Sequence, residues 1–254
     1  MELVQEKMSL RSPEPHAGRV LVVIPAYNEA AAVGQVVASV RAQGLPALVV
    51  DDGSTDRTAA EAAEAGAIII RLGRNSGKGA ALQAGFRYAL DEAYDAVITL
   101  DADGQHDPAE IPRFLDAFWS RTDDLIIGAR NFDDMPWTRY TMNILGRWTF
   151  SWVVGETMLD NQSGYRMVSR RLVAASLRSP ESGYEFEVDM IIICLEEDLS
   201  LGWVPIRTIY NEHPSHINHV KHVLQYLRLL MQIRRRLKAH AERRDKEAIA
   251  ERSC

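Results

Sequence analysis

Residues 96–105 read Ala-Val-Ile-Thr-Leu-Asp-Ala-Asp-Gly-Gln, so a short apolar run leads directly into two carboxylates. Such a run is typical of a strand buried in a parallel sheet. The like charges of Asp101 and Asp103 repel each other, and each raises the other's pKa unless a cation lies between them. Mg²⁺ and Mn²⁺ prefer such hard oxygen ligands, and these ions commonly also hold substrate phosphates. An isolated Asp-x-Asp is more often a solvated turn, but its place at a strand end favours a metal site, to which Gln105 offers a further oxygen.

The same succession of strand, polar cluster and helix recurs along the chain. It predicts strands at residues 19–24, 47–50, 67–72, 96–100 and 125–128, and helices at 30–43, 55–65, 79–92 and from 108 onward. Asn28 is a candidate N-cap for the first helix. The alternation implies an α/β fold with a Rossmann-like, mostly parallel sheet and helices on both faces. Ligands bind beyond the carboxyl ends of such strands, so the polar clusters at 25–29, 51–54 and 101–105 are expected to converge on one crevice.

The composition excludes several classes of protein. The 254 residues carry a formal net charge of −6, which disfavours a nucleic-acid binder. The two cysteines, Cys194 and Cys254, supply neither a disulfide framework nor a zinc cluster, and a cytoplasmic setting fits them best. No stretch of about 18 uncharged apolar residues occurs, so no transmembrane helix is expected. Residues 1–18 lack the apolar core of a signal peptide and are interpreted as a flexible lead-in.

Two further clusters carry candidate ligands. Residues 51–56 read Asp-Asp-Gly-Ser-Thr-Asp, where an acidic side chain can accept hydrogen bonds from a ribose hydroxyl or a base N–H. A turn with a helix cap is the alternative, and both readings can hold together: Asp56 is expected to be structural and Asp52 to bind a ligand. Residues 73–79, Gly-Arg-Asn-Ser-Gly-Lys-Gly, have the wrong glycine spacing for a P-loop, so an ATPase is rejected. Lys78 either faces the ligand or belongs to a structural turn.

Four motifs occur in order with consistent spacing. They are Ile-Pro-Ala-Tyr-Asn-Glu at 24–29, Asp-Asp-Gly-Ser-Thr-Asp-Arg-Thr at 51–58, Asn-Ser-Gly-Lys-Gly at 75–79 and Asp-Ala-Asp-Gly-Gln at 101–105. Together they resemble glycosyltransferase family 2, which implies a GT-A fold. They are most similar to its dolichyl-phosphate mannose synthase and polyprenyl-phosphate glycosyltransferase branch. Residues 160–166, 186–187 and 204–206 extend the match, which predicts a GT-A domain at 19–217 between the lead-in and a tail at 218–254.

The resemblance implies a role for each matching residue. Pro25, Tyr27 and Glu29 would hold the nucleotide base and ribose, with Asp52 in contact with one or the other. The remaining nucleotide-sugar residues would be Lys78, Asp101, Ala102, Asp103 and His216. Asp101 and Asp103 would hold Mg²⁺ or Mn²⁺ on the donor diphosphate, with Gln105 close to the ion.

The resemblance also assigns the reaction centre. Arg130 would meet phosphate there, and it joins Asp103 as a catalytic candidate. Arg166 is a weaker candidate for the acceptor phosphate, the alternative being that it pairs only with a structural carboxylate. The branch often carries a Ser-Lys pair in a lid over the donor, and this chain has Ser215 and His216 there. A histidine is cationic only near or below its pKa of about 6.5.

The implied reaction is inverting transfer of a sugar from a UDP- or GDP-sugar. A hydroxyl acceptor needs a general base. A phosphate monoester does not, since its second pKa of about 6 leaves it anionic at pH 7. No base candidate is as distinct as the Asp101/Asp103 pair, which favours a polyprenyl or dolichyl phosphate acceptor. The alternatives are a soluble family 2 enzyme with a hydroxyl acceptor and, disfavoured by the intact acidic pair, a binding module without turnover.

Two segments raise the question of a membrane. Residues 135–157 hold Trp137, Trp148 and Trp152 with interspersed arginines, as interfacial helices do, although a core helix is the alternative. Residues 221–246 hold nine Lys and Arg against two acidic residues. This basic amphipathic tail suits an anionic cytoplasmic membrane face, and a packing or oligomerising helix is equally compatible. The oligomeric state is left open.

Overall fold

The computed structural model describes residues 18–130, 137–207, 230–240 and 242. Its seven strands form one sheet in the order β3-β2-β1-β4-β6-β5-β7. Their bounds are β1 (Val20–Ala26), β2 (Ala47–Asp51), β3 (Ile68–Arg71), β4 (Ala96–Thr99), β5 (Leu125–Arg130), β6 (Arg166–Ser169) and β7 (Leu201–Ile206). All neighbours pair in parallel except β6, which is antiparallel to both β4 and β5. The mostly parallel sheet is confirmed.

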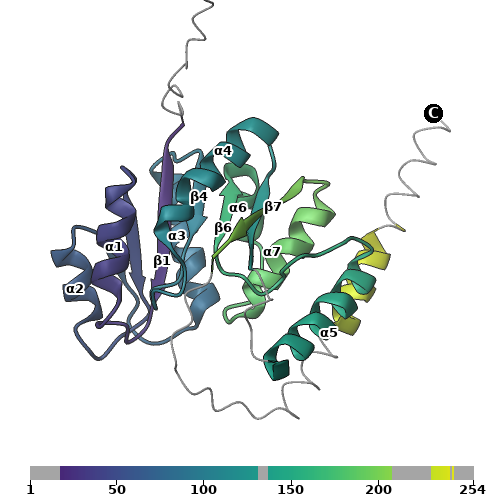
Figure 1. Cartoon of the computed structure of the whole chain (residues 1–254), viewed down its shortest axis with the longest axis horizontal. Coiled ribbons are helices and arrows are strands. Elements are labelled where there is room, and N and C mark those ends of the chain that lie inside the picture. Colours follow the sequence, from purple (N-terminus) through teal and green to yellow (C-terminus); the bar gives the residue numbers. More distant parts are fainter. Residues whose placement is uncertain (1–17, 131–136, 208–229, 241, 243–254) are drawn as a thin grey trace, which may run out of the picture.

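Helices cover both faces of this sheet, as the sequence predicts (Figure 1). They are α1 (Val33–Ala42), α2 (Thr58–Glu64), α3 (Lys78–Asp91), the 3₁₀ turn η1 (Pro108–Glu110), α4 (Ile111–Arg121), α5 (Trp137–Val154), α6 (Arg170–Ser176) and α7 (Glu185–Glu196). Successive strand residues point to opposite faces. Val23 of β1 therefore joins the core under α3, α6 and α7, while Val22 joins the core under α1 and α4.

Two helices begin later than their sequence patterns predict. Asn28 adopts a left-handed backbone with φ 56°, and its side-chain oxygen accepts a hydrogen bond from the Thr55 amide at 2.9 Å. It therefore links two loops instead of capping α1, which begins at Val33. Similarly, α2 begins at Thr58 because residues 55–57 form a turn in which the Thr58 amide donates to Asp56 Oδ1 at 2.9 Å.

The topology brings the polar clusters together at one edge of the sheet. β1, β2 and β4 are neighbours and parallel, so their carboxyl ends lie side by side. β6 runs the other way, with Arg166 opposite Thr99, and the segment that enters β6 therefore reaches the same edge. α3 packs closely on β1: a Cβ on Gly85 would lie 2.4 Å from a methyl carbon of Val23. The polar clusters after the three parallel strands thus converge, as expected.

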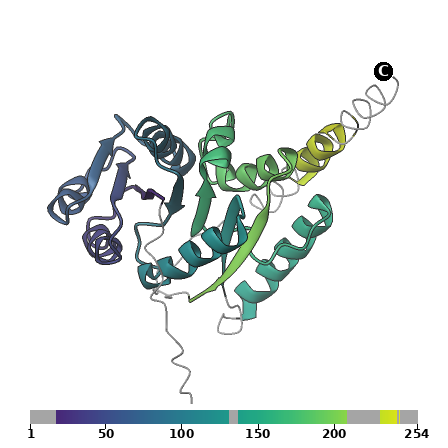
Figure 2. The same ribbon diagram turned by 90° about the horizontal axis from the view of Figure 1, so that it is seen from above.

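Beyond β7, the structure describes a further helix, residues 230–240, which we call the tail helix. It lies with α5 on the side of the molecule remote from α1 and α2 in both views (Figures 1 and 2). Leu230 and Ile233 are buried in the core that α7 shares. Among the described helices, none is long and apolar enough to cross a bilayer. The expected domain boundaries at 18 and 217 stay predictions, since the second falls outside the described residues.

Candidate active site

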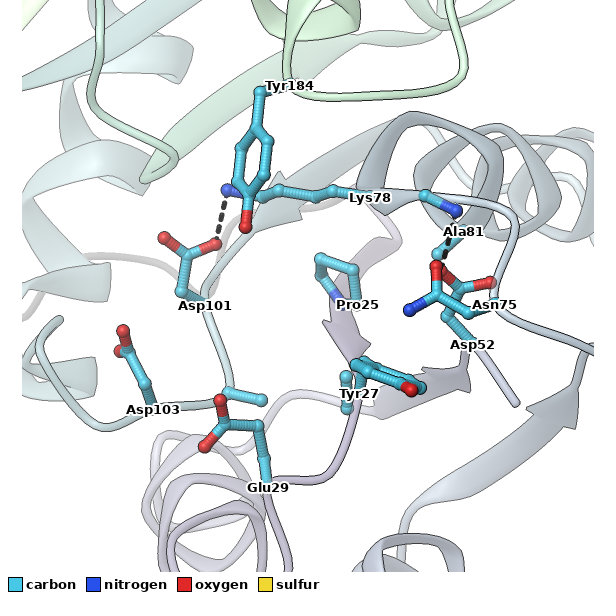
Figure 3. Close-up of a pocket in the computed structure, with 13 residues that line it drawn as sticks. Pro25, Tyr27, Glu29, Asp52, Asn75, Lys78, Ala81, Asp101, Asp103 and Tyr184 are labelled. Atoms are coloured by element: carbon cyan, nitrogen blue, oxygen red, sulfur yellow. Dashed lines mark hydrogen bonds and ion pairs between the residues drawn. The ribbon is translucent and has the colours of Figure 1, made fainter. Parts of the chain in front are cut away.

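A cavity of about 330 Å³ opens at the carboxyl ends of β1, β2 and β4 (Figure 3). Eight of the nine residues expected to bind a nucleotide sugar line it: Pro25, Tyr27, Glu29, Asp52, Lys78, Asp101, Ala102 and Asp103. The ninth, His216, lies outside the described residues, as does Ser215. The remaining lining residues are Ala26, Asn75, Gly77, Ala81 and Tyr184. Four motifs that are far apart in sequence therefore form the wall of one cavity.

The first two motifs are hydrogen-bonded to each other. The Asn28 amide donates to Ser54 Oγ at 2.9 Å, and the Glu29 amide donates to Thr58 Oγ1 at 2.8 Å. Asn28 reaches these partners because it adopts the left-handed backbone that asparagine tolerates better than most residues. The turn leaves the Tyr27 side chain 44% exposed at the cavity, where its ring is a flat apolar surface for a ligand.

Asp52 combines a structural contact with a place on the cavity wall. Its two oxygens accept hydrogen bonds from the Ser76 amide at 2.7 Å and the Gly77 amide at 2.8 Å. The carboxylate therefore holds the loop at 73–79 against the end of β2. Each carboxylate oxygen has a second lone pair, so these bonds are compatible with a further contact to a ligand. The two readings of Asp52 that the sequence leaves open are compatible in this geometry.

Lys78 forms a buried ion-pair group with two carboxylates. Its Nζ lies 2.6 Å from Asp101 Oδ1 and 3.1 Å from Glu187 Oε2. Burial lowers the pKa of Lys78, but the charges of Asp101 and Glu187 outweigh burial and raise the pKa above its ordinary value. The ammonium is therefore charged throughout the physiological range. Gly77 allows this arrangement: its φ is 101°, and a Cβ there would lie 2.4 Å from the carbonyl oxygen of Ser182.

The carboxylate of Asp101 is kept ionised by its neighbours. Burial raises its pKa, but Lys78, and after it His106, lower the pKa below the ordinary value. His106 Nδ1 lies 3.7 Å from Asp101 Oδ2, and burial lowers the pKa of this imidazole. The repulsion between Asp101 and Asp103 calls for a nearby cation. Lys78 supplies that positive charge to Asp101.

The acidic end of the cavity has the chemistry of a divalent-metal site. Glu29, Asp101 and Asp103 lie at this end, and Asp52 and Asn75 lie at the other (Figure 3). Asp101 Oδ1 already holds one cation, the Lys78 ammonium. The described residues contain no preformed cluster of three or more His, Cys, Asp or Glu that could hold a metal ion. Two carboxylates fit Mg²⁺ or Mn²⁺ in a site that phosphate oxygens and water complete.

Gln105 and Arg130 are not among the described residues that line the cavity. The Gln105 backbone amide donates to Asp103 Oδ1 at 2.9 Å, which orients that carboxylate. Arg130, the last residue of β5, donates to both oxygens of Asp160 at 2.6 and 3.0 Å. Asp160 is 2% exposed, so this bidentate pair fixes the guanidinium at the carboxyl edge of the sheet.

Arg166 requires a correction. Its side chain is fully buried, and its guanidinium donates to the backbone carbonyls of Ser163, Glu187 and Asn161. A side chain enclosed by main-chain oxygens does not present its charge to an acceptor phosphate. Burial lowers the pKa of Arg166, and the charges of Glu187, Asp160 and Asp101 oppose this effect, in keeping with the alternative of a structural role beside carboxylates. Arg166 instead ties the segment that enters β6 to α7, the helix that carries Glu187.

The sequence interpretation assigned no role to several residues of the site. Tyr184 is 75% exposed at the cavity mouth, with Lys78 Nζ 5.8 Å from its ring centre. Glu187 and Asp160 lie in segments that match the family, and this match is a sequence signal that could have identified them. Their residue types alone do not suggest a particular chemical role. His106 follows the Asp-Ala-Asp-Gly-Gln motif directly, yet a lone histidine carries no pattern of its own.

The overall fold is the GT-A fold of glycosyltransferases. A crystal structure of glucosyl-3-phosphoglycerate synthase from Mycobacterium tuberculosis, in complex with Mn²⁺, UDP-glucose and phosphoglyceric acid, matches with a TM-score of 0.69. The match covers 85% of this chain and 80% of that one at 20% sequence identity, so it bears on the fold alone.

The sequence profile of glycosyl transferase family 2 matches residues 21–176, more than half of the chain, and the chain belongs to this family. It is 34% identical over 209 residues to the undecaprenyl-phosphate mannosyltransferase of Micrococcus luteus, covering 76% of this chain and 85% of that protein. It is 32% identical over 209 residues to the polyprenol monophosphomannose synthase of Mycolicibacterium smegmatis, covering 76% and 78%. These relatives bear out the branch that the motifs resemble.

Proposed function

We propose that this glycosyltransferase moves a sugar from a UDP- or GDP-sugar to a polyprenyl phosphate, with inversion at the anomeric carbon and with Mg²⁺ or Mn²⁺ as cofactor. The observation that carries the proposal is the convergence of four motifs on one cavity with an acidic end. The names of the two relatives, each of which contains a polyprenyl carrier, support the acceptor class.

The cavity suits a nucleotide diphosphate in one orientation. Tyr27 and Asp52 offer a flat ring and a hydrogen-bond acceptor, which fit a base and a ribose. Lys78, Asp101 and Asp103 lie toward the other end, where the diphosphate would lie (Figure 3). A volume of about 330 Å³ is within the range of small-molecule sites, of about 300–1,000 Å³. The sugar would then face the mouth beside Tyr184.

Leaving-group stabilisation follows from the charges at the acidic end. Asp101 and Asp103 would hold the divalent ion, which when bound supplies positive charge to the departing diphosphate. The Lys78 ammonium adds a fixed charge within the same wall, already desolvated and oriented by Asp101 and Glu187. The chain's own contribution is to hold these charges where negative charge develops on the diphosphate.

The acceptor needs a group that recognises an anion and no group that removes a proton, since a phosphate monoester is already anionic. Arg130 is the candidate for this contact. Its pair with Asp160 fixes the direction of the guanidinium and leaves the side chain 20% exposed. A peripheral place on the cytoplasmic face of the membrane would follow for an enzyme whose acceptor carries a polyprenyl chain.

A donor screen tests the proposal. UDP- and GDP-sugars are incubated with Mg²⁺ or Mn²⁺ and a short-chain polyprenyl phosphate, and products are detected by mass spectrometry. We expect one nucleotide class to support transfer, and the Asp103→Asn variant to lose it while keeping the wild-type melting temperature. Transfer by Asp103→Asn at the wild-type rate would remove the assigned metal site. Glycosylation of hydroxyl acceptors only would favour the alternative of a hydroxyl-specific transferase.

A further inference from the structure

We infer that the outer faces of α5 and the tail helix together form a docking surface for an anionic lipid bilayer. We call it the Trp–Arg surface, and its residues are Trp148, Trp152, Met231, Arg234, Arg235 and Lys238. The inference extends the proposed function, because a polyprenyl phosphate is held in a bilayer, and it names the surface that meets that bilayer.

α5 presents two large aromatic side chains to solvent. Trp148 is 69% exposed and Trp152 is 65% exposed, and their spacing of four residues places them on one face of the helix. Phe150, on the opposite face, is buried in the core. A helix needs only its inner stripe to pack. Two exposed indoles on the outer stripe therefore have no role in the packing of the described core.

The tail helix presents a matching face. Leu230 and Ile233 are buried, whereas Met231 is 54% exposed. Arg234, Arg235 and Lys238 are also exposed, and their spacing continues the face that Met231 begins. The guanidinium of Arg234 lies 4.7 Å from the ring centre of Trp152. This contact joins the two helices, so their outer faces form one surface, on the same side of the molecule in both views (Figures 1 and 2).

The tail helix is held in place by charges on its inner side. Arg236 donates to both oxygens of Glu196 at 2.6 and 2.7 Å and also pairs with Asp189, both on α7. Glu196 and Asp189 are largely buried, so Arg236 has anionic partners within the protein. Arg235 and Lys238 are exposed instead, and the only acidic partner that either has among the described residues is the exposed Glu242, 3.8 Å from Lys238 Nζ. In the tail helix, Arg236 therefore attaches the helix to α7, whereas Arg235 and Lys238 lie on its exposed part.

The mixture of indoles and outward cations fits a bilayer better than it fits water or a neutral apolar partner. Tryptophan is enriched at the headgroup level of membranes, where one side of the ring is apolar and the other is wet. Cations near an anionic leaflet gain about 1 kcal/mol each, and the attraction fades within a Debye length. The formal net charge of −6 repels such a leaflet, so binding requires a locally basic face. The Trp–Arg surface meets both requirements.

The surface is also connected to the site. β5 ends at Arg130, the candidate acceptor contact, and α5 begins at Trp137, so only six residues separate them. The chain that leaves the sheet at Arg130 therefore soon enters the helix that carries Trp148 and Trp152.

Co-sedimentation with vesicles tests the inference without any substrate. The full chain is mixed with vesicles of phosphatidylglycerol and phosphatidylcholine, or of phosphatidylcholine alone, at low and high salt. We expect binding to the anionic vesicles that weakens as salt rises. The variants Trp148→Ser/Trp152→Ser and Arg234→Gln/Arg235→Gln should each bind at least about fivefold more weakly. The control Arg57→Gln/Arg87→Gln removes an equal charge from the turn before α2 and from α3, and it should bind like the wild type.

Several results would overturn the inference. The surface is wrongly assigned if the wild type does not bind anionic vesicles, or if the two surface variants bind as well as it does. It is also wrongly assigned if the tryptophan variant converts a dimer to a monomer in light scattering, which would make the face a contact between copies of this chain. Vesicle binding with no transfer to a short, water-soluble polyprenyl phosphate would instead contradict the proposed function and leave the docking surface standing.

Discussion

At the residue scale, the account depends on a lysine that serves as an internal cation. Lys78 contacts Asp101 and Glu187, and the second oxygen of Glu187 has no hydrogen-bond partner among the described residues. Without the ammonium, Asp101 and Glu187 would lose the cation that they share, and the buried Arg166 would remain as the fixed positive charge that acts on both. The sequence leaves open whether Lys78 faces the ligand or supports a turn, and the geometry combines the two, since it is the first residue of α3 and also lines the cavity.

Replacing Lys78 tests its structural role and its role in ligand binding. Lys78→Met keeps the length of the side chain and removes its charge, so we expect a loss of about 3 kcal/mol of unfolding free energy, because breaking a buried ion pair leaves its partners uncompensated. We also expect the affinity for UDP or GDP to fall at least tenfold in calorimetric titrations at a temperature where the variant is folded. Lys78→Arg, which retains a positive charge, should recover part of both. Unchanged nucleotide affinity in a destabilised Lys78→Met protein would make the lysine a purely structural residue.

At the element scale, two charged groups hold elements together at the ends of β5 and α7. Asp124 precedes β5, and its carboxylate accepts hydrogen bonds from Ser169 Oγ at 2.8 Å, from Arg171 at 2.8 Å and from the Ser200 amide at 3.3 Å. It thereby joins β5 to the start of α6 and to the segment before β7. Arg236 performs the corresponding task for the tail helix, through Glu196 and Asp189 of α7.

Asp124 should make the fold sensitive to acid. Burial raises the pKa of its carboxyl group, but the hydrogen bonds from Arg171 and Ser169 lower it below the ordinary value. The unfolded chain then binds the proton more readily, so this contribution to stability is present above about pH 4 and is lost as the pH falls through the folded pKa. In urea denaturation, the difference between wild type and Asp124→Asn should be constant above about pH 5 and shrink below about pH 4. A difference independent of pH would contradict the assignment.

Arg236 should matter more than its neighbour on the same helix. Arg236→Gln leaves Asp189 without its cation and Glu196 with only the more distant Arg178, 3.7 Å away. We expect it to lower the unfolding free energy by about 1–3 kcal/mol in urea denaturation. Arg235→Gln removes an equal charge from the exposed face and should change stability by less than about 0.5 kcal/mol. Equal effects of the two substitutions would show that the tail helix is not anchored through α7.

At the scale of the whole molecule, the sequence predicts best those structural features that short-range patterns encode. The apolar runs locate β1 to β5, and the polar clusters that follow β1, β2 and β4 meet because parallel strands end at one edge. The insertion of β6 between β4 and β5 has no such pattern, since its four residues, Arg-Met-Val-Ser, are too few and too polar to mark a buried strand. Arg166 was assigned to an acceptor for the same reason: only the tertiary fold shows that it is enclosed by carbonyl oxygens.

The candidate site also combines residues that a local pattern predicts with residues that only the tertiary fold brings together. Asp101 and Asp103 stand out because adjacent carboxylates after a strand are electrostatically unfavourable without a cation. Tyr184 precedes α7 and reaches the cavity mouth only through the packing of its loop on α3, where the Ala80 amide donates to the carbonyl oxygen of Ser182 at 2.9 Å. A contact that depends on two segments about a hundred residues apart leaves no trace in local spacing.

The most direct measurement uses a matched pair of acceptors, a short-chain polyprenyl phosphate and the polyprenol of the same chain length. Both are incubated with the donor identified in the screen and with Mn²⁺, and kcat/KM is determined for each in detergent. The account predicts transfer to the phosphate that exceeds transfer to the alcohol by at least a hundredfold, because only the phosphate is anionic at pH 7 and needs no general base. Equal or faster transfer to the alcohol would contradict it.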